Sequence, residues 1–370
     1  MTRVDSEMIG RRVAEARVRA GLTQFDLARV VGLDRSALAK VETGGRRVSA
    51  LELARIAEET GEAFEWFVTD PPPAIVSYRI GVGAPATSSI DRLIEQVARD
   101  VELVQSLGVL DVIEFEPFDQ PADVAQAESL AATARTTLGL DPAGPITDLV
   151  TPLADFGLFA FAHNLGVDAP DSATTLLHRG GVSVVNSDRA VGRRRLALAH
   201  ELGHYLLADE YTVDWRVGAW PDSQRTEWLI DVFARAFLLP VDSLRSRWAD
   251  LRARESIRES AVRAASEFRV DMSTLAARLS ELNLADQEEL SLVRAVTTTR
   301  ADIIEHDLLV AHDLEGTSLP RRYEKAVLAL YRSERISVGR TAELLRGTVD
   351  EAALPQLPPV HESEIWKFVS

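Results

Sequence analysis

Apolar residues recur at helical spacing through most of this chain of 370 residues, and short β-branched runs interrupt that spacing only near its middle. The first 69 residues predict five short helices, because apolar positions three and four apart alternate with glycine turns and Ser, Thr or Asp caps. Residues 158–162, 174–178 and 182–186 instead predict the strands of a small sheet. The pattern is helical again beyond residue 240. It predicts a mainly α protein with a small β-sheet, in the α+β class.

Breaks in the pattern divide the chain into parts. A triple proline and a later stretch rich in Gly and Ser predict a linker over residues 70–89. This linker joins a five-helix domain at 1–69 to a second domain at 90–245, and residues 246–370 are expected to form a helical C-terminal region. Residues 256–282 contain a second pair of helices joined by a tight turn. Mixed charges on this pair favour a packing role over contact with DNA.

Composition limits the cellular compartment in which we expect the protein and the kinds of metal site that it can form. No apolar run reaches the roughly 18 residues of a membrane span, and the N-terminus lacks a signal-peptide pattern, so we expect a cytoplasmic protein that does not enter the membrane. The chain has no cysteine, which excludes disulfides and cysteine-ligated zinc. Its net charge is −16, and almost all of that charge lies beyond residue 70. That acidic part should repel DNA.

The most informative motif is the sequence His200-Glu-Leu-Gly-His204, on a helix predicted over residues 193–207. Two histidines four residues apart share a helical face and can bind one metal ion, most plausibly zinc. Glu201 lies one position round the helix, where it can reach a water on the metal rather than the metal itself. Two ligands and a general base on one helical turn are typical of a hydrolytic zinc site.

A third ligand is expected from a later helix. Glu227 lies 23 residues after His204 and shares a helical face with Asp231. Glu227 could bind the metal, and Asp231 could accept a hydrogen bond from a ligand histidine and fix its tautomer. The same pattern also fits an ordinary helix with solvated acids. Other acids closer to the first helix could substitute for Glu227: Asp209, Glu210 and Asp214.

The runs at 195–204 and 231–240 together resemble the ImmA/IrrE-type zinc peptidase family. The resemblance implies a compact gluzincin-like metallopeptidase in which His200 and His204 hold zinc and Glu201 is the base. In one departure from the family pattern, the chain has Leu229 where the family often has glutamate.

A second departure from the family pattern is Ile230-Asp231, where the family often has Ala-Asn. Glu227 is kept as the third ligand because its spacing to Asp231 preserves a ligand with a hydrogen-bonding acid beside it. Near the predicted sheet, His163 or His178 could stabilise an oxyanion, and Tyr205, directly after the motif, could act as a hydroxyl donor. Structural roles are favoured for all three.

The N-terminal module carries an independent signal. Two short helices joined by a turn at Gly32 match a helix-turn-helix. Leu22-Thr-Gln24, Ala28 and Val41-Glu42 before a glycine turn resemble the lambda-repressor/Cro-type (XRE) family. That likeness implies a recognition helix over residues 34–43. The residues implied to face operator DNA are Gln24, Arg35, Ser36, Ala37, Lys40, Arg46 and Arg47.

These residues would have different tasks. Gln24 would lie at the edge of the duplex, Arg46 and Arg47 would contact phosphates, and Arg35 could read a guanine edge or bind a phosphate. A helical protein-interaction module is the alternative, because residues 1–70 hold 11 basic and 12 acidic residues, whereas a DNA binder usually has a basic surface. DNA binding by this module therefore calls for a homodimer or a second contact. The helices predicted at 320–346 could dock or dimerise.

The two motifs together predict a DNA-binding transcriptional regulator fused to a zinc-dependent endopeptidase. The family likeness implies a repressor-like or antitoxin-like protein substrate, and cleavage of the chain's own linker near residues 70–90 is an alternative. In a different class of function, the protein would be a non-proteolytic transcriptional regulator or antitoxin whose peptidase-like domain senses a ligand or partner. Leu229 favours that class slightly, and the presence of Glu201 argues against it, since a structural metal site needs no general base.

Overall fold

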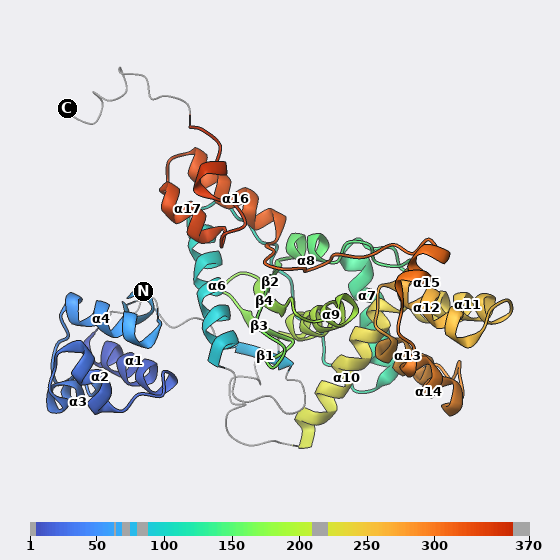
Figure 1. Cartoon of the computed structure of the whole chain (residues 1–370), viewed down its shortest axis with the longest axis horizontal. Coiled ribbons are helices and arrows are strands. Elements are labelled where there is room, and N and C mark those ends of the chain that lie inside the picture. Colours follow the sequence, from blue (N-terminus) through green and yellow to red (C-terminus); the bar gives the residue numbers. More distant parts are fainter. Residues whose placement is uncertain (1–4, 63, 69–74, 80–87, 209–220, 358–370) are drawn as a thin grey trace. The chain divides into compact units, whose positions relative to one another are not determined.

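The computed structural model describes residues 5–62, 64–68, 75–79, 88–208 and 221–357. The chain divides into two compact units, residues 1–73 and 74–370 (Figure 1). Helices dominate both units, and the described strands form one small sheet in the second, which confirms the predicted α+β class. Among the described residues, no helix is both long and apolar enough to cross a membrane.

The first unit contains, over its described residues, the five predicted helices. They are α1 (Ser6–Arg19), α2 (Gln24–Val31), α3 (Arg35–Glu42), α4 (Ala50–Thr60) and α5 (Phe64–Val68). Local chemistry places their ends: Thr23 caps α2, Asp34 caps α3, and Gly32 ends α2 in the left-handed region with φ 81°. Glycine adopts that conformation without the steric cost of a Cβ. The turn therefore fixes α3 against α2.

The second unit is built on a sheet with strand order β1-β3-β4-β2. Its strands are β1 (Ile75–Arg79), β2 (Leu158–His163), β3 (Ser172–Leu176) and β4 (Gly181–Asn186). β2 and β4 are parallel, whereas β3 runs antiparallel to both β4 and β1. Strand β3 begins two residues earlier than the sequence pattern predicts. Strand β1 lies inside the predicted linker at 70–89, where the proline and glycine content alone indicates no strand.

One face of the sheet is covered by α6 (Ser88–Ser106), α16 (Arg321–Arg332) and α17 (Val338–Leu344). Their apolar side chains, such as Val97, Tyr323 and Leu344, share a core with Phe161 of β2. Helices α16 and α17 therefore pack on the sheet beside α6, which ends more than 200 residues earlier in the sequence.

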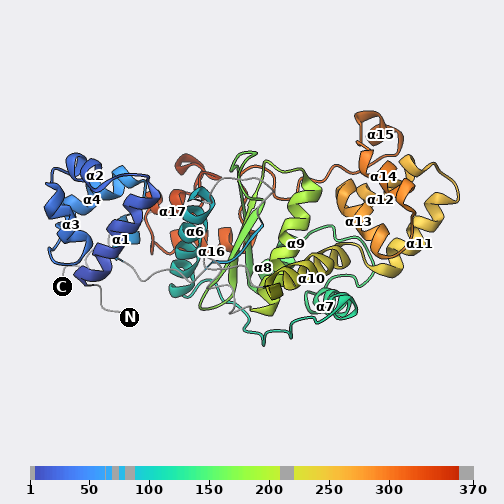
Figure 2. The ribbon, with the colours of Figure 1, turned by 90° about the horizontal axis from the view of Figure 1, so that it is seen from below.

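The opposite face carries α9 (Val191–Leu207), so that the sheet lies between α6 and α9 (Figure 2). The helices that share its core are α7 (Val124–Thr137), α8 (Val150–Phe156), α10 (Pro221–Leu238), α11 (Val241–Arg252), α12 (Ile257–Phe268), α13 (Met272–Glu281) and α14 (Gln287–Ala295). The predicted domain boundary at residue 245 falls inside α11. Helices on both sides of it bury their side chains in one core.

Short elements complete the C-terminal region. Helix α15 (Arg300–Glu305) precedes a segment in which Ser318 pairs with Ala162 of β2, and a 3-10 helix spans Glu351–Ala353. In the helix pair predicted at 256–282, the apolar side chains of α12 and α13 are buried in the shared core, including Phe268 and Leu275.

Candidate metal centre and helix-turn-helix surface

Helix α9 is held in place by burial along almost its whole length. Leu198, Leu202 and Leu206 are in the core. The fully buried Arg195 bonds to Asp313, at 2.7 Å, and to the carbonyl of Ile146, at 2.6 Å. A buried arginine is stable only with such partners. The arginine that precedes the histidine motif therefore anchors the motif's helix.

Helix α10 crosses α9 at Gly203, between the two motif residues Leu202 and His204. A Cβ at Gly203 would lie 2.8 Å from Cγ2 of Ile230 and 3.1 Å from Cδ1 of Phe233. Such contacts are too close for a side chain, so glycine allows the two helices to approach. Glu227, three residues before Ile230 on α10, is thereby brought to His200 and His204.

Three ligand atoms form a compact triangle. The Nε2 atoms of His200 and His204 lie 3.2 Å apart, and Oε2 of Glu227 lies 3.3 Å from the first and 3.5 Å from the second. Zinc bonds of about 2.0–2.1 Å at tetrahedral angles place two ligand atoms about 3.3–3.4 Å apart. The donor set and its spacing therefore fit one zinc ion held by His200, His204 and Glu227.

The charge state of Glu227 suits a ligand. Burial alone would raise the pKa of its carboxyl, but hydrogen bonds and charge interactions with His200 and His204 outweigh burial and hold the pKa well below its usual range. A metal ligand must be deprotonated to bind. The Glu227 carboxylate is therefore an anion at neutral pH.

Asp231 lies one turn after Glu227 on α10 and binds the first histidine. Its Oδ1 is 2.9 Å from Nδ1 of His200. With Nδ1 donating its proton to this carboxylate, Nε2 is the atom of His200 that is left to bind a metal ion. The Nδ1 atom of His204 is buried and has no hydrogen-bond partner among the described residues.

Glu201 is fully buried beside the two histidines. The hydroxyl of Ser172 donates to its Oε1 at 2.7 Å. The second oxygen, Oε2, is buried and has no hydrogen-bond partner among the described residues. One carboxylate oxygen is thus fixed, and the other is available for proton transfer. Sequence reasoning missed Ser172, because the residue belongs to no motif and lies before the predicted strand.

The three other side chains that the sequence offered for catalysis lie outside the metal cluster. Tyr205 is buried, its hydroxyl faces the carbonyl of Phe156 at 3.4 Å, and burial raises its pKa. Burial and the charge of Arg346 lower the pKa of His163 to about 4, and His178 is exposed beside Glu102. None of these three belongs to the metal cluster.

Two other features of the sequence are the leucine that departs from the family pattern and the acids that could replace Glu227 as a ligand. Leu229, where the family often has glutamate, packs into the hydrophobic core with α10. The substitute ligands Asp209, Glu210 and Asp214 lie outside the described residues.

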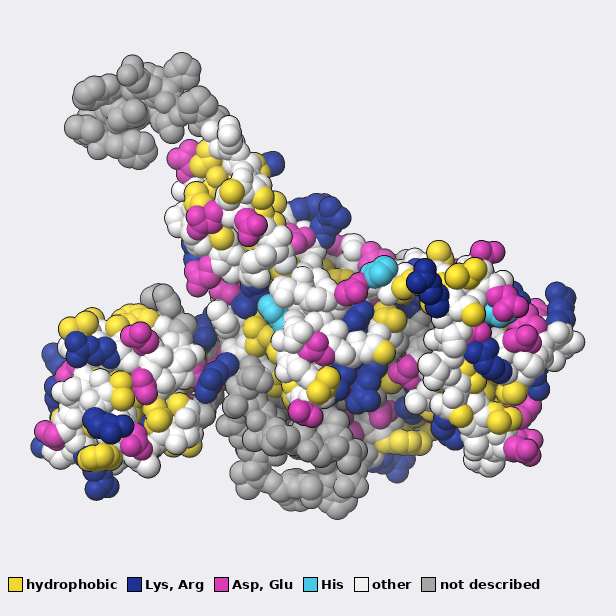
Figure 3. Space-filling model, viewed as in Figure 1, with side chains coloured by type: hydrophobic (Ala, Val, Ile, Leu, Met, Phe, Trp, Pro, Cys, Tyr) yellow, Lys and Arg dark blue, Asp and Glu magenta, His cyan; other side chains and the backbone are white. Residues whose placement is uncertain are grey.

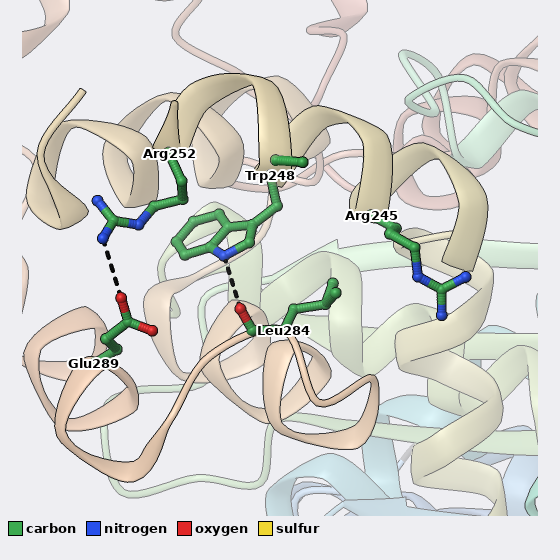
Figure 4. Close-up of a pocket in the computed structure, with 6 residues that line it drawn as sticks. Arg245, Trp248, Arg252, Leu284 and Glu289 are labelled. Carbon is green, nitrogen blue, oxygen red and sulfur yellow. Dashed lines mark hydrogen bonds and ion pairs between the residues drawn. The ribbon is translucent and has the colours of Figure 1, made fainter. Parts of the chain in front are cut away.

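A separate pocket lies between α11 and the segment that leads into α14 (Figure 4). Trp248 Nε1 donates to the carbonyl of Leu284 at 3.2 Å, and Arg252 pairs with Glu289 at 3.0 Å. The described residues that line it are Arg245, Trp248, Ala249, Arg252, Leu284 and Glu289. None of them belongs to the triangle of ligand atoms.

In the first unit, the predicted DNA-facing residues lie on α2, α3 and the turn that follows. Gln24 donates to Oε2 of Glu42 at 2.7 Å, and Glu42 also pairs with Arg17 at 2.6 Å. This network ties the start of α2 to the end of α3. Arg35, Ser36 and Lys40 are exposed and Ala37 is half-buried, all on α3.

After α3, Arg46 pairs with Glu52 at 2.8 Å and Arg47 is exposed. The face of this unit seen in Figure 3 mixes basic, acidic and apolar side chains rather than presenting one basic patch. The mixture agrees with the near-neutral charge of residues 1–70.

Comparison with known families finds one match in the N-terminal unit and one in the second unit. Residues 13–67 match the helix-turn-helix family, and residues 155–280 match the family described as the IrrE N-terminal-like domain. The second match spans β2 to α13 and includes all four residues His200, Glu201, His204 and Glu227. The chain therefore carries an XRE-type helix-turn-helix domain followed by an IrrE/ImmA-like domain, which confirms both resemblances.

Two of the solved structures that align with this chain are of DNA-related proteins by their descriptions. The restriction-modification controller protein C.AhdI from Aeromonas hydrophila is 34% identical over 16% of this chain and 92% of its own, with a TM-score of 0.16. PlcR from Bacillus thuringiensis, solved with the peptide PapR7 and DNA, is 12% identical over 92% of each chain, with a TM-score of 0.18. No curated protein matches this chain.

Proposed function

We propose that this protein is a DNA-binding regulator fused to a zinc-dependent endopeptidase. The observation that carries the proposal is the triangle of His200, His204 and Glu227, with separations of 3.2, 3.3 and 3.5 Å, beside the buried Glu201. A structural zinc site needs no general base, whereas hydrolysis does. The presence of Glu201 next to the ligand triangle therefore favours catalysis.

Each residue of the centre has a task. Zinc, when bound by the three ligands, supplies a Lewis acid that polarises the peptide carbonyl and makes water more acidic. Glu201 takes the proton of the attacking water at Oε2 and passes it to the leaving amine as the C–N bond breaks. Ser172 holds Oε1 of Glu201 in place during both transfers, and Asp231 keeps His200 in the ligand tautomer.

In this proposal the helix-turn-helix domain binds operator DNA and so determines where the protein acts. We infer that α3 enters the major groove through Arg35, Ser36, Ala37 and Lys40. Gln24 lies at the edge of the duplex, held there by Glu42. Arg46 and Arg47 contact phosphates. Because the unit is nearly neutral, two copies bind a two-part operator more tightly than one.

The substrate class follows from this arrangement. A peptidase fixed to an operator meets proteins bound to the same DNA at high local concentration. We therefore propose that the substrate is a regulatory protein of the repressor or antitoxin kind.

The test measures metal and cleavage together. Wild-type protein should hold about one zinc ion per chain and cut fluorescently labelled casein. Glu227→Ala should lose both properties, and Glu201→Gln should keep zinc but lose cleavage. A zinc-free wild type after zinc is supplied contradicts the metal centre. A zinc-loaded protein that still binds DNA but cuts nothing, both as wild type and as the Ser77→Pro variant in which the pairing of β1 is weakened, favours the sensor class of function.

A further inference from the structure

The edge of β3 that faces away from β4 lies beside the catalytic centre. An unpaired strand edge presents backbone N–H and C=O groups that can pair with an extended peptide. Ser172 is the first residue of β3 and its hydroxyl holds Glu201, at 2.7 Å. An extended peptide paired along this edge therefore reaches the general base where it passes Ser172.

In this structure β1 takes that edge. It pairs antiparallel with β3 in a register that places Tyr78 opposite Ala173 and Arg79 opposite Ser172. β1 also lies against α9, the helix that carries the histidine motif. The last residue of β1 is thus the backbone partner of the residue that positions Glu201.

β1 belongs to the second unit but lies outside the part of the chain that matches the peptidase-type family. The match to the IrrE N-terminal-like domain begins at residue 155, about 75 residues after β1 ends. The helix-turn-helix unit ends at Pro73, two residues before Ile75. A change in that unit that pulls on the chain therefore acts first on β1.

The pairing of β1 with β3 has the features of a strand pair that can separate. β1 has five residues, pairs on one side only within the described part of the chain, and its register is interrupted between Ile75 and Ser77. Three prolines precede it at residues 71–73, and proline cannot extend a hydrogen-bonded ladder. Short edge elements with few backbone bonds belong to the parts of a fold that open at low cost.

We propose that β1 is an autoinhibitory strand. It occupies the edge of β3 on which the backbone of an extended protein substrate pairs, and the substrate is cut only when β1 leaves. This inference rests on the proposed peptidase function. It names the mode of substrate binding, by strand addition to β3, and the segment of the chain that competes with the substrate.

The first test traps the pairing without reference to activity. The chain has no cysteine, so Tyr78→Cys with Ala173→Cys creates a single possible disulfide. Opposed residues of an antiparallel pair lie about 4.5–5.5 Å apart at Cα, which suits a disulfide. Arg79→Cys with Ala173→Cys is the matched control, because neighbouring residues of a strand point to opposite faces. On mild oxidation the first protein should crosslink, and the control should not.

The second test measures cleavage of labelled casein by the zinc-loaded full-length protein. The oxidised Tyr78→Cys, Ala173→Cys protein should cut about tenfold more slowly than the same protein after reduction. Ser77→Pro, which weakens the pairing, should cut faster than wild type.

Different failures have different meanings. An active protein that gives no crosslink overturns the pairing and the inhibition. A crosslink with equal rates before and after reduction overturns the inhibition. Cleavage of the chain within residues 70–90 overturns it too, since β1 is then a substrate. A crosslink in a protein that cuts nothing, in Ser77→Pro as in wild type, defeats the peptidase function and with it the inhibition.

Discussion

The hydroxyl of Ser172 on β3 lies 2.7 Å from Oε1 of Glu201 on α9, and both side chains are fully buried. This bond joins the strand on which we expect a substrate to pair to the helix that carries the general base. It also occupies one carboxylate oxygen and leaves Oε2 for the proton. Strand register and catalytic geometry are therefore coupled through one hydrogen bond.

Ser172→Ala should lower kcat about tenfold, because Glu201 loses the bond that fixes its orientation. KM and zinc content should stay close to wild type, since neither the ligands nor the backbone edge of β3 changes. Steady-state cleavage of labelled casein, with zinc measured on the same sample, checks this split. Ser172→Thr keeps the hydroxyl and should recover most of the rate. A Ser172→Ala protein with unchanged kcat contradicts the positioning role.

Asp231→Ala should weaken zinc binding about 10–100-fold, because His200 loses the carboxylate that fixes its tautomer. The bond it removes is the 2.9 Å contact between Asp231 Oδ1 and His200 Nδ1. Competition with a zinc-binding dye measures the affinity. Asp242→Ala, at an exposed acid on α11, is the control and should bind zinc as wild type does. Equal affinities for both variants would remove Asp231 from the metal centre.

The sequence alone predicted those parts of the site and the fold that depend on residues close together in the chain. The spacing of His200 and His204 places both side chains on one face of any helix, and the caps and Gly32 mark the helix-turn-helix. Ser172 and β1 carried no such signal. Their roles depend on the register of strands paired across about 95 residues of sequence, and periodicity within a strand does not specify its partner. Glu227 lies between these cases, since its approach to the histidines depends on close packing at Gly203.

His163 should make the folded state sensitive to mild acid. Burial, with a smaller effect of the Arg346 charge, lowers its pKa from 6.5 to about 4. The unfolded chain therefore takes up the proton first, and stability that is complete above a pH of about 6.5 falls as the pH drops toward 4. The urea midpoint of His163→Leu should consequently fall less than that of wild type between pH of about 7.5 and about 5. His178→Leu, at an exposed histidine, should behave as wild type, and an identical fall in all three proteins would exclude His163 as the source.

Arg35→Ala should weaken binding to a DNA duplex selected from a random pool by the wild-type protein. Arg35 is exposed at the start of α3, the helix that we place in the major groove. Loss of a bidentate contact to a base costs about 1–3 kcal/mol and relaxes sequence preference at one position. Loss of a phosphate contact lowers affinity for all sequences alike and reduces the salt dependence by about one ion. Binding curves at several salt concentrations, on the selected and on scrambled duplexes, separate the two. Arg11→Ala, at an exposed arginine on α1, is the control, and an equal effect of both variants would show that α3 does not read the groove.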